Sequence, residues 1–175
     1  LGKYIKEKDN TAKVVFIGPC VAKKAEVRKK EVSQYVDYAM TFEELQALID
    51  SKNISLLDLE ETELNQATHF GRIFARTGGL TEALEQALKE MNLSDFEFKP
   101  VICNGIEKCR TALAKADKDV LDGNFIEGMA CIGGCVGGAG NLVHWEDAPA
   151  GVDEYGKDAN AQEILTDTKK VINIF

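Results

Sequence analysis

Apolar and polar positions along this chain form blocks that predict strands and helices in alternation. The run Thr11–Ile17 is β-branched and apolar, and it ends at Gly18-Pro19, which is typical of a buried parallel strand. Similar short runs predict further strands near 36–40, 99–103 (the end of the run 96–103) and 124–129. Because amphipathic stretches separate these runs, the sequence predicts an α/β fold in which helices flank parallel sheets.

The amphipathic stretches have recognisable starts. Thr41 and Glu44 have the spacing of a capping box, which predicts a helix to about Asp50. Pro19 suits the first turn of a helix over 21–30. Further helices are expected from Leu80 to about Met91 with Thr77 as its cap, from Gly105 to about Lys115, and from Ala161 to Lys170. The polar stretch 51–68 is expected to be a connection with room for one short helix.

Composition and charge exclude several classes of protein. The 175 residues are enough for one core or two small lobes, and 29 acidic against 21 basic residues give a net charge of −8. This balance argues against nucleic acid or an anionic membrane as a partner, and no apolar run has the length of a membrane span. Five dispersed cysteines indicate metal or redox thiols in a reducing compartment rather than a disulfide scaffold, so we expect a cytoplasmic protein.

The most distinctive chemistry lies in the stretch 127–140. Cys131 and Cys135 are four residues apart, and five glycines lie between positions 131 and 140. Thiolates are soft ligands that suit iron–sulfur clusters, and glycine allows the sharp turn that would bring two of them to one cluster. The alternative interpretation is a glycine-rich turn that contains two buried thiols.

Two other strand-to-helix junctions carry cysteines. Cys20 directly follows the first predicted strand, and Lys23 and Glu26 follow at intervals of three on the same side of the expected helix. A solvated basic helix with an inert cysteine is the alternative there. Cys103 and Cys109 flank the other junction. Three interpretations are open for them: further cluster ligands, a redox pair or, as we favour, buried thiols. The Cys20 and Cys131 junctions would meet at a cleft where parallel strands end.

The motifs around these cysteines resemble those of a known family. Residues 18–26, Gly-Pro-Cys-Val-Ala-Lys-Lys-Ala-Glu, resemble the second signature of the iron-only (FeFe) hydrogenases, Met-Pro-Cys-x-x-Lys-x-x-Glu. Residues 127–135, Glu-Gly-Met-Ala-Cys-Ile-Gly-Gly-Cys, resemble their third, Glu-x-Met-Ala-Cys-x-x-Gly-Cys. Residues 74–79 with Glu82 and Ala83 resemble the segment between the two. Order and spacing agree over nearly the whole chain, which implies part of the family's two-lobed catalytic domain.

The resemblance implies an H-cluster, a 4Fe-4S cubane joined to a two-iron unit with CO, cyanide and dithiolate ligands. Cys20, Cys131 and Cys135 match three of the four cubane ligands, and Cys135 matches the one that bridges to the two-iron unit. Lys23 matches a lysine that contacts a cyanide ligand, and Met129 matches a methionine packed on the two-iron unit. The expected catalytic residues are therefore Lys23, Met129 and Cys135.

The neighbouring positions have supporting roles in this interpretation. Thr77, Gly78 and Gly79 form a Gly-Gly turn that enters a helix, a geometry that can bind anions, and they are expected to contact the cofactor. Glu26 and Glu127 would hold the ligands in place. The sequence departs from the family pattern with Gly18 for Met, Ala139 for Gly and Asn141 for Gln. These departures favour a divergent or sensory branch of the family.

The family's first signature, Thr-Ser-Cys-Cys-Pro, has no counterpart here, so residues 1–175 are expected to be a C-terminal fragment of the H-cluster domain. The upstream part of the same protein would supply the fourth cubane ligand, and the fragment alone is expected to be inactive and to lack its cluster. The full-length protein would interconvert H2 with protons and electrons, or sense H2, in an anaerobic cytoplasm with an electron carrier such as ferredoxin.

Two other functions are consistent with some of these residues. A non-catalytic, hydrogenase-like iron–sulfur protein of cluster assembly would keep the cysteines, but it would give Lys23 and Met129 nothing to contact. A metal-free thiol enzyme could use Cys20 as its nucleophile, although His69 and His144 are the only candidate bases of their type. The hydrogenase interpretation is therefore favoured.

Overall fold

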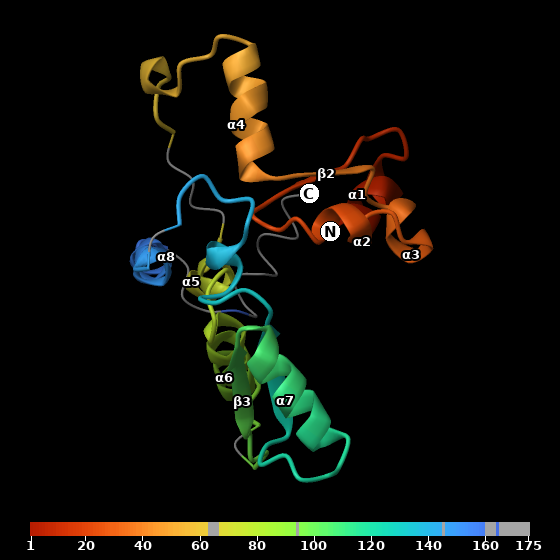
Figure 1. Ribbon diagram of the computed structural model, residues 1–175, viewed down its shortest axis with the longest axis vertical. Coiled ribbons are helices and arrows are strands. Elements are labelled where there is room, and N and C mark those ends of the chain that lie inside the picture. Colours follow the sequence, from red (N-terminus) through yellow and green to blue (C-terminus); the bar gives the residue numbers. More distant parts are fainter. Residues whose placement is uncertain (63–66, 94, 145, 160–163, 165–175) are drawn as a thin grey trace. The chain divides into compact units, whose positions relative to one another are not determined.

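The computed structural model describes residues 1–62, 67–93, 95–144, 146–159 and 164. The chain divides into two compact units. Unit 1 comprises Leu1–Glu61 and Gly138–His144, and unit 2 comprises Thr62–Gly137 and Trp145–Phe175. Each unit contains one pair of parallel strands with helices beside it (Figure 1). The predicted α/β class with parallel sheets is therefore confirmed.

Unit 1 is built on strands β1 (Val15–Ile17) and β2 (Tyr38–Met40), which pair in parallel with Val15 opposite Tyr38. Its helical segments are α1 (Gly2–Lys8), α2 (Lys23–Glu26), α3 (Lys30–Ser33), α4 (Phe42–Ser51) and the 3-10 turn η1 (Leu56–Asp58). The predicted capping box of α4 is present, because Thr41 Oγ1 accepts from the Glu44 amide at 3.2 Å and Glu44 Oε2 accepts from the Thr41 amide at 2.9 Å.

One carboxylate ties the start of unit 1 to its sheet. Asp37 Oδ2 accepts hydrogen bonds from Lys6 Nζ at 2.8 Å and from the Val14 amide at 2.8 Å. Lys6 Nζ also donates to the Ala12 carbonyl at 2.7 Å. The hydrogen bond from Lys6, followed by that from Val14, lowers the pKa of Asp37 to about 2. Helix α1, which was not predicted, is thus attached to the strands through this carboxylate.

Two predictions for unit 1 were wrong in part. The first strand is shorter than Thr11–Ile17, and its residues Val15–Ile17 are exposed rather than buried. An apolar run indicates burial only where neighbours cover it, and this sheet has two strands. The single helix expected over 21–30 is two four-residue helices, because Lys29 adopts an extended conformation between α2 and α3. Helix α2 begins only at Lys23, so Cys20 precedes it by three residues and the prediction that Pro19 lies in its first turn was wrong.

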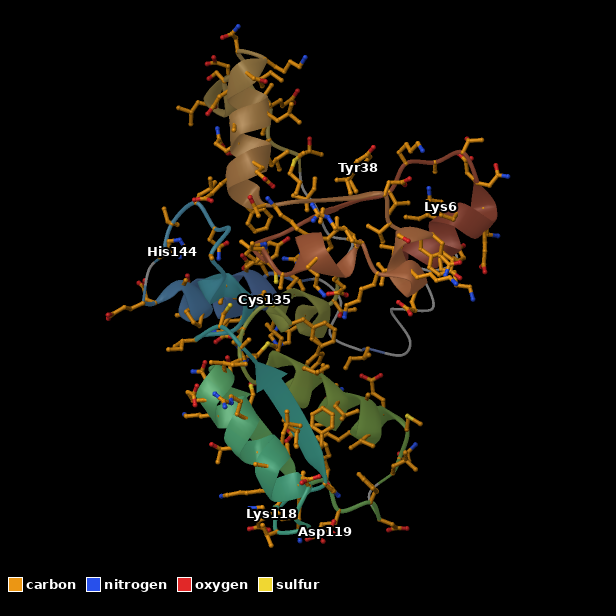
Figure 2. The ribbon with its side chains drawn as sticks, turned by 45° about the vertical axis from the view of Figure 1, so that its right-hand side comes forward. Lys6, Tyr38, Lys118, Asp119, Cys135 and His144 are labelled. Atoms are coloured by element: carbon orange, nitrogen blue, oxygen red, sulfur yellow. The ribbon has the colours of Figure 1, made fainter. Side chains whose placement is uncertain are left out.

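Unit 2 is built on strands β3 (Pro100–Asn104) and β4 (Phe125–Met129), which pair in parallel with Cys103 opposite Gly128. Its helical segments are α5 (His69–Ile73), α6 (Gly79–Glu90), α7 (Ile106–Ala116), η2 (Cys135–Gly137) and α8 (Ala148–Lys157). Figures 1 and 2, from two directions, both show the strands between α6 and α7. The strand-to-helix alternation predicted for this part of the chain is confirmed.

The buried apolar side chains that the structure describes belong to unit 2: Ile73, Ala83, Cys103, Ala112 and Ala159. Helices α5 and α8 approach closely, because a Cβ on Gly156 would lie only 2.7 Å from Ile73 Cγ2. Arg72 reinforces this pair of helices, since it donates to the Tyr155 carbonyl at 2.9 Å and lies 4.2 Å from the centre of the Tyr155 ring. This packing gives unit 2 a core of its own.

The sequence missed α5 and α8, since α5 has five residues and α8 contains Pro149 and Gly151. The strand expected over 96–103 begins only at Pro100. The helix expected from Ala161 to Lys170 falls almost entirely outside the described residues. In the part of the chain that is described, no helix is long and apolar enough to cross a membrane.

Candidate metal-cluster site

The loop that follows β4 in unit 2 carries Cys131 and Cys135. The Gly134 amide donates to the Cys131 carbonyl at 3.1 Å, and the Gly137 amide donates to the Gly134 carbonyl at 3.0 Å. Gly133 and Gly134 have φ values of 85° and 98°, a region that favours glycine. The predicted sharp turn between the two cysteines is therefore present, and the glycines make it possible.

This loop is held against the segment that precedes α6. Arg76 and Gly134 form an isolated antiparallel bridge, and the Thr77 amide donates to the Gly133 carbonyl at 3.0 Å. The Val136 amide donates to the Ala75 carbonyl at 2.9 Å. A Cβ on Gly134 would lie 2.6 Å from the Thr77 amide nitrogen, so no larger residue fits. Residues 74–79, which resemble the family segment between the two cysteine signatures, thus support the cysteine loop through their backbone.

A side chain at the end of β3 joins the same network. Asn104 Oδ1 accepts from the Gly133 amide at 2.7 Å and from Thr77 Oγ1 at 3.3 Å. Sequence reasoning missed this residue, because an Asn before Gly105 reads as a turn. Its position at the carboxyl end of a predicted parallel strand was the available signal. Asn104 thus links the end of β3 to the cysteine loop by hydrogen bonds.

Glu127 of β4 is a buried carboxylate with 1% of its surface exposed. It accepts hydrogen bonds from the Gly78 amide at 2.7 Å, the Thr81 amide at 2.8 Å and Thr81 Oγ1 at 2.6 Å. It therefore caps the N-terminus of α6, where Gly78 rather than Thr77 is the N-cap residue. The prediction that Thr77 caps this helix was wrong, because the carboxylate from β4 takes that place.

The glycines of this turn have structural reasons of their own. Gly78 has a φ of 90°, and a Cβ on Gly79 would lie 2.0 Å from the Ile73 carbonyl oxygen. The Gly78 amide donates to Glu127, and the Thr77 amide donates to Gly133. A cofactor-binding role for Thr77, Gly78 and Gly79 stays a prediction, since their observed contacts are within the protein.

Arg76 ties the support of the loop to two helices. Its guanidinium, on a side chain 13% exposed, donates to both oxygens of Glu82 at 2.8 Å and pairs with Asp153 of α8. Desolvation on its own would lower the pKa of Arg76, but the hydrogen bonds to Asp153 and Glu82 outweigh it and raise the pKa. The segment that holds the loop is thereby fixed to α6 and α8.

The second cysteine segment lies in unit 1, where half-buried Cys20 follows β1. The neighbouring Pro19 carbonyl accepts from the Gly140 amide at 3.0 Å, and the Gly140 carbonyl accepts from the Phe42 amide at 3.1 Å. A Cβ on Gly140 would lie 2.7 Å from Thr41, so glycine is required here too. The glycine-rich stretch therefore contributes its first part to unit 2 and its last part to unit 1.

Lys23 and Glu26, which were predicted to lie on the same side of a helix, form an ion pair with 2.5 Å between Lys23 Nζ and Glu26 Oε2. Both side chains are about two-fifths exposed, at 38% and 43%, so this pair is accessible to water. The Lys23 amide donates to the Cys20 carbonyl at 3.3 Å. The ammonium group is thus attached to the same short segment as the Cys20 thiol.

All five cysteines are described, and none forms a disulfide. Cys131 is half-buried, and Cys135, labelled in Figure 2, is exposed. Cys103 is buried as predicted, whereas Cys109 is half-buried. Among the described residues, no three His, Cys, Asp or Glu side chains are gathered closely enough to hold a metal ion. Convergence of Cys20 and Lys23 of unit 1 with Cys131, Cys135 and Met129 of unit 2 stays a prediction.

Comparison with known proteins shows where these motifs occur. The family model described as iron-only hydrogenase large subunit, C-terminal domain, matches residues 1–139. The chain is 30% identical over 159 residues to iron hydrogenase 1 of Clostridium pasteurianum, covering 72% of this chain and 28% of the relative. It is 30% identical over 162 residues to the periplasmic Fe hydrogenase large subunit of Nitratidesulfovibrio vulgaris, covering 74% and 38%. The chain thus spans between about a quarter and two-fifths of these relatives.

Solved structures agree on the fold. One, from work on oxygen inactivation of FeFe-hydrogenase, has a TM-score of 0.67 and 18% identity, over 99% of this chain and 60% of the other. A variant of HydA1 from Chlamydomonas reinhardtii has a TM-score of 0.65 and 17% identity, over 99% and 62%. The family match covers more than half of this chain and includes both cysteine segments. The chain belongs to the iron-only (FeFe) hydrogenase large-subunit family, as part of its C-terminal domain.

Proposed function

We propose that this chain is the part of an H-cluster domain that supplies Cys20, Cys131 and Cys135 to a 4Fe-4S cluster. In the full-length protein the domain would serve reversible H2 oxidation, or H2 sensing. When bound, the H-cluster supplies the redox chemistry that interconverts H2 with two protons and two electrons. The observation that carries the proposal is the tight loop of Cys131–Gly137, built around glycines and held by two backbone hydrogen bonds to Ala75 and Thr77.

The residues of this chain fit such a cofactor in their donor chemistry. The three cysteines are thiols, which are the ligands that iron–sulfur clusters use. Gly133 and Gly134 turn the backbone, so that the two cysteines of the loop are joined without a regular helix or strand between them. Networks around Asn104 and Glu127 hold this loop and its support in one arrangement. Rigid support of this kind is what a ligand loop needs, because ligand positions depend on the groups behind them.

Lys23 and Met129 distinguish an H-cluster protein from a relative that has only a 4Fe-4S cluster. A lysine ammonium next to an anionic metal centre is strongly favoured once water is excluded, and Lys23 is bonded to the Cys20 segment. Its present partner Glu26 would orient it. Met129 ends β4 two residues before Cys131, where a polarizable thioether can pack on a soft metal unit. These two positions favour the hydrogenase proposal over a role in cluster assembly.

The proposal also concerns the fourth cubane ligand, for which residues 1–175 have no matched cysteine. Three matched cysteines leave a cubane one ligand short, and the fourth would come from an upstream segment of the same protein. We therefore expect residues 1–175 alone to be inactive and free of cluster. We expect a cytoplasmic protein that exchanges electrons with a carrier such as ferredoxin and binds neither nucleic acid nor membranes, although one relative is named as periplasmic.

The test is H2 uptake by the full-length protein, purified without oxygen and supplied with a 4Fe-4S cluster and a mature two-iron unit. We expect uptake that falls about 10-fold or more in Lys23→Ala, because removal of a group that supports a metal centre typically costs that much. Exposed Lys29 lies on the same segment, and Lys29→Ala is the matched control that should keep activity. Iron binding without uptake, and no difference between the two variants, would indicate a non-catalytic iron–sulfur protein instead.

A further inference from the structure

Cys103 and Cys109 lie on facing elements of unit 2. Cys103 is the penultimate residue of β3 and is 2% exposed, and Cys109 is in the first half of α7. Cys103 and Ala112 line one cavity of about 330 Å³ between β3 and α7. Neither thiol has a role in the proposed cluster.

The sulfur of Cys109 is directed at the end of the sheet. Cys109 Sγ is 3.8 Å from the Cys103 carbonyl oxygen and 3.6 Å from the Met129 carbonyl oxygen. It would lie 3.4 Å from a Cβ on Gly128, and Gly128 is the residue opposite Cys103 in the parallel pair. Because residues opposite one another in a sheet point to the same face, Cys103 is on the face of the sheet that the Cys109 sulfur contacts.

The two thiols differ in accessibility. Cys109 is half-buried, whereas Cys103 is almost completely buried. Burial, followed by the neighbouring Cys109 thiol, raises the pKa of Cys103. A reagent from solvent would therefore meet Cys109 first, and Cys103 would be the second thiol to react.

We propose that Cys103 and Cys109 are a redox modification site, which a hydroperoxide converts reversibly into an intramolecular disulfide. The Cys109 sulfur attacks the O–O bond of the hydroperoxide, which releases an alcohol, or water from hydrogen peroxide, and leaves a sulfenic acid. The Cys103 sulfur then displaces the hydroxyl from that sulfur, the S–S bond forms, and water leaves. Two thiols and one hydroperoxide thus give one disulfide, one alcohol and one water.

This bond would act on the cysteine loop through two contacts. Cys103 is adjacent to Asn104, whose side chain holds the Gly133 amide at 2.7 Å. Cys109 donates to the Met129 carbonyl, and Met129 is two residues before Cys131. Formation of the disulfide removes this donor and constrains the end of β3, so the loop loses part of its support. Any effect on a bound cluster rests on the proposed function, whereas the disulfide itself does not.

The first experiment is differential thiol labelling of the purified full-length protein before and after exposure to hydrogen peroxide, read by mass spectrometry for each cysteine. We expect Cys103 and Cys109 to lose their reactive thiols together, to appear in one linked peptide that has lost two hydrogen atoms, and to recover with dithiothreitol. Oxidation of Cys109 to a sulfinic acid while Cys103 remains a thiol would overturn the proposal. A bond from Cys103 to Cys131 or Cys135 would also overturn it.

Two single variants make the result specific, with folding checked by circular dichroism. In Cys109→Ser, Cys103 should remain a thiol after the same exposure. In the matched control Cys135→Ser, the linked Cys103–Cys109 peptide should form as in the parent. Hydrogen exchange at the Gly133 amide should become faster on oxidation of the parent but not of Cys109→Ser. If the disulfide forms and this exchange is unchanged, the coupling to the loop is wrong.

Discussion

The two units of this chain are stabilised in different ways. The described part of unit 2 has buried side chains from α5, α6, β3, β4 and α7. In unit 1, the strand residues remain open to solvent, with Val15, Phe16 and Ile17 at 37–43% and Tyr38, labelled in Figure 2, at 65% exposed. Unit 1 relies on hydrogen bonds from a few polar side chains, whereas unit 2 adds a packed interior. Within this chain, the cysteine loop therefore belongs to the better-packed unit.

In each unit, one carboxylate accepts hydrogen bonds that hold a backbone segment. Substituting these two carboxylates therefore measures how much such contacts stabilise each unit. In unit 2, Glu127 is 1% exposed and accepts three hydrogen bonds at the start of α6. In unit 1, Asp37 has a side chain 20% exposed and binds Lys6 and the Val14 amide. Because burial prevents water from replacing a lost acceptor, the same kind of contact is expected to contribute more in unit 2.

The largest effect is expected for Glu127→Ala. This substitution leaves the Gly78 and Thr81 donors buried without an acceptor, so we expect unit 2 to lose about 3 kcal/mol of unfolding free energy. Chemical denaturation monitored by circular dichroism gives the value, and hydrogen exchange at Gly78 and Thr81 should accelerate. Glu85→Ala, on an exposed position of the same helix, is the control and should have little effect. Equal losses in the two variants would mean that Glu127 does not hold α6.

A smaller, pH-dependent effect is expected for Asp37→Asn. The folded-state pKa of Asp37 is lowered from 3.8 to about 2, so its contribution is present above pH 3.8 and is lost as the pH falls through about 2. Amide protection of β1 and β2, followed by NMR over this range, should fall in the parent, while Asp37→Asn starts lower and changes less. Exposed Asp58→Asn should behave like the parent. A parent with no loss of protection in this range would contradict the assignment.

The smallest effect is expected at the cap of α4. Thr41→Ala removes the hydroxyl that accepts from the Glu44 amide, and we expect a loss of about 1 kcal/mol of unfolding free energy. Thr41→Ser keeps the hydroxyl and removes only the methyl group, which would lie 2.7 Å from a Cβ on Gly140. If Thr41→Ser loses as much unfolding free energy as Thr41→Ala, the methyl group and not the cap stabilises this end of the helix.

Local patterns in the sequence predicted the parallel strands, the Thr41 cap and the glycine turn at Cys131–Cys135, because spacing and backbone chemistry determine these features. The cap of α6 could not be predicted in this way, since Glu127 is 49 residues from Gly78 and the contact exists only after β4 is placed. Asn104 was missed for the same reason. Burial of β1 was overestimated, because an apolar run does not reveal how many strands will cover it. The features that could not be predicted from the sequence thus depend mostly on contacts between residues far apart in the chain.

We propose that Cys20 of unit 1 and Cys131 of unit 2 bind one cluster, and the iron content of the full-length protein, purified without oxygen, tests this proposal. We expect Cys20→Ser and Cys131→Ser each to remove the same set of about four iron atoms, with no further loss in the double variant, because a cubane needs all of its ligands. Cys109→Ser should retain the iron. Partial losses that add together in the double variant, or unchanged iron in either single variant, would contradict a shared cluster.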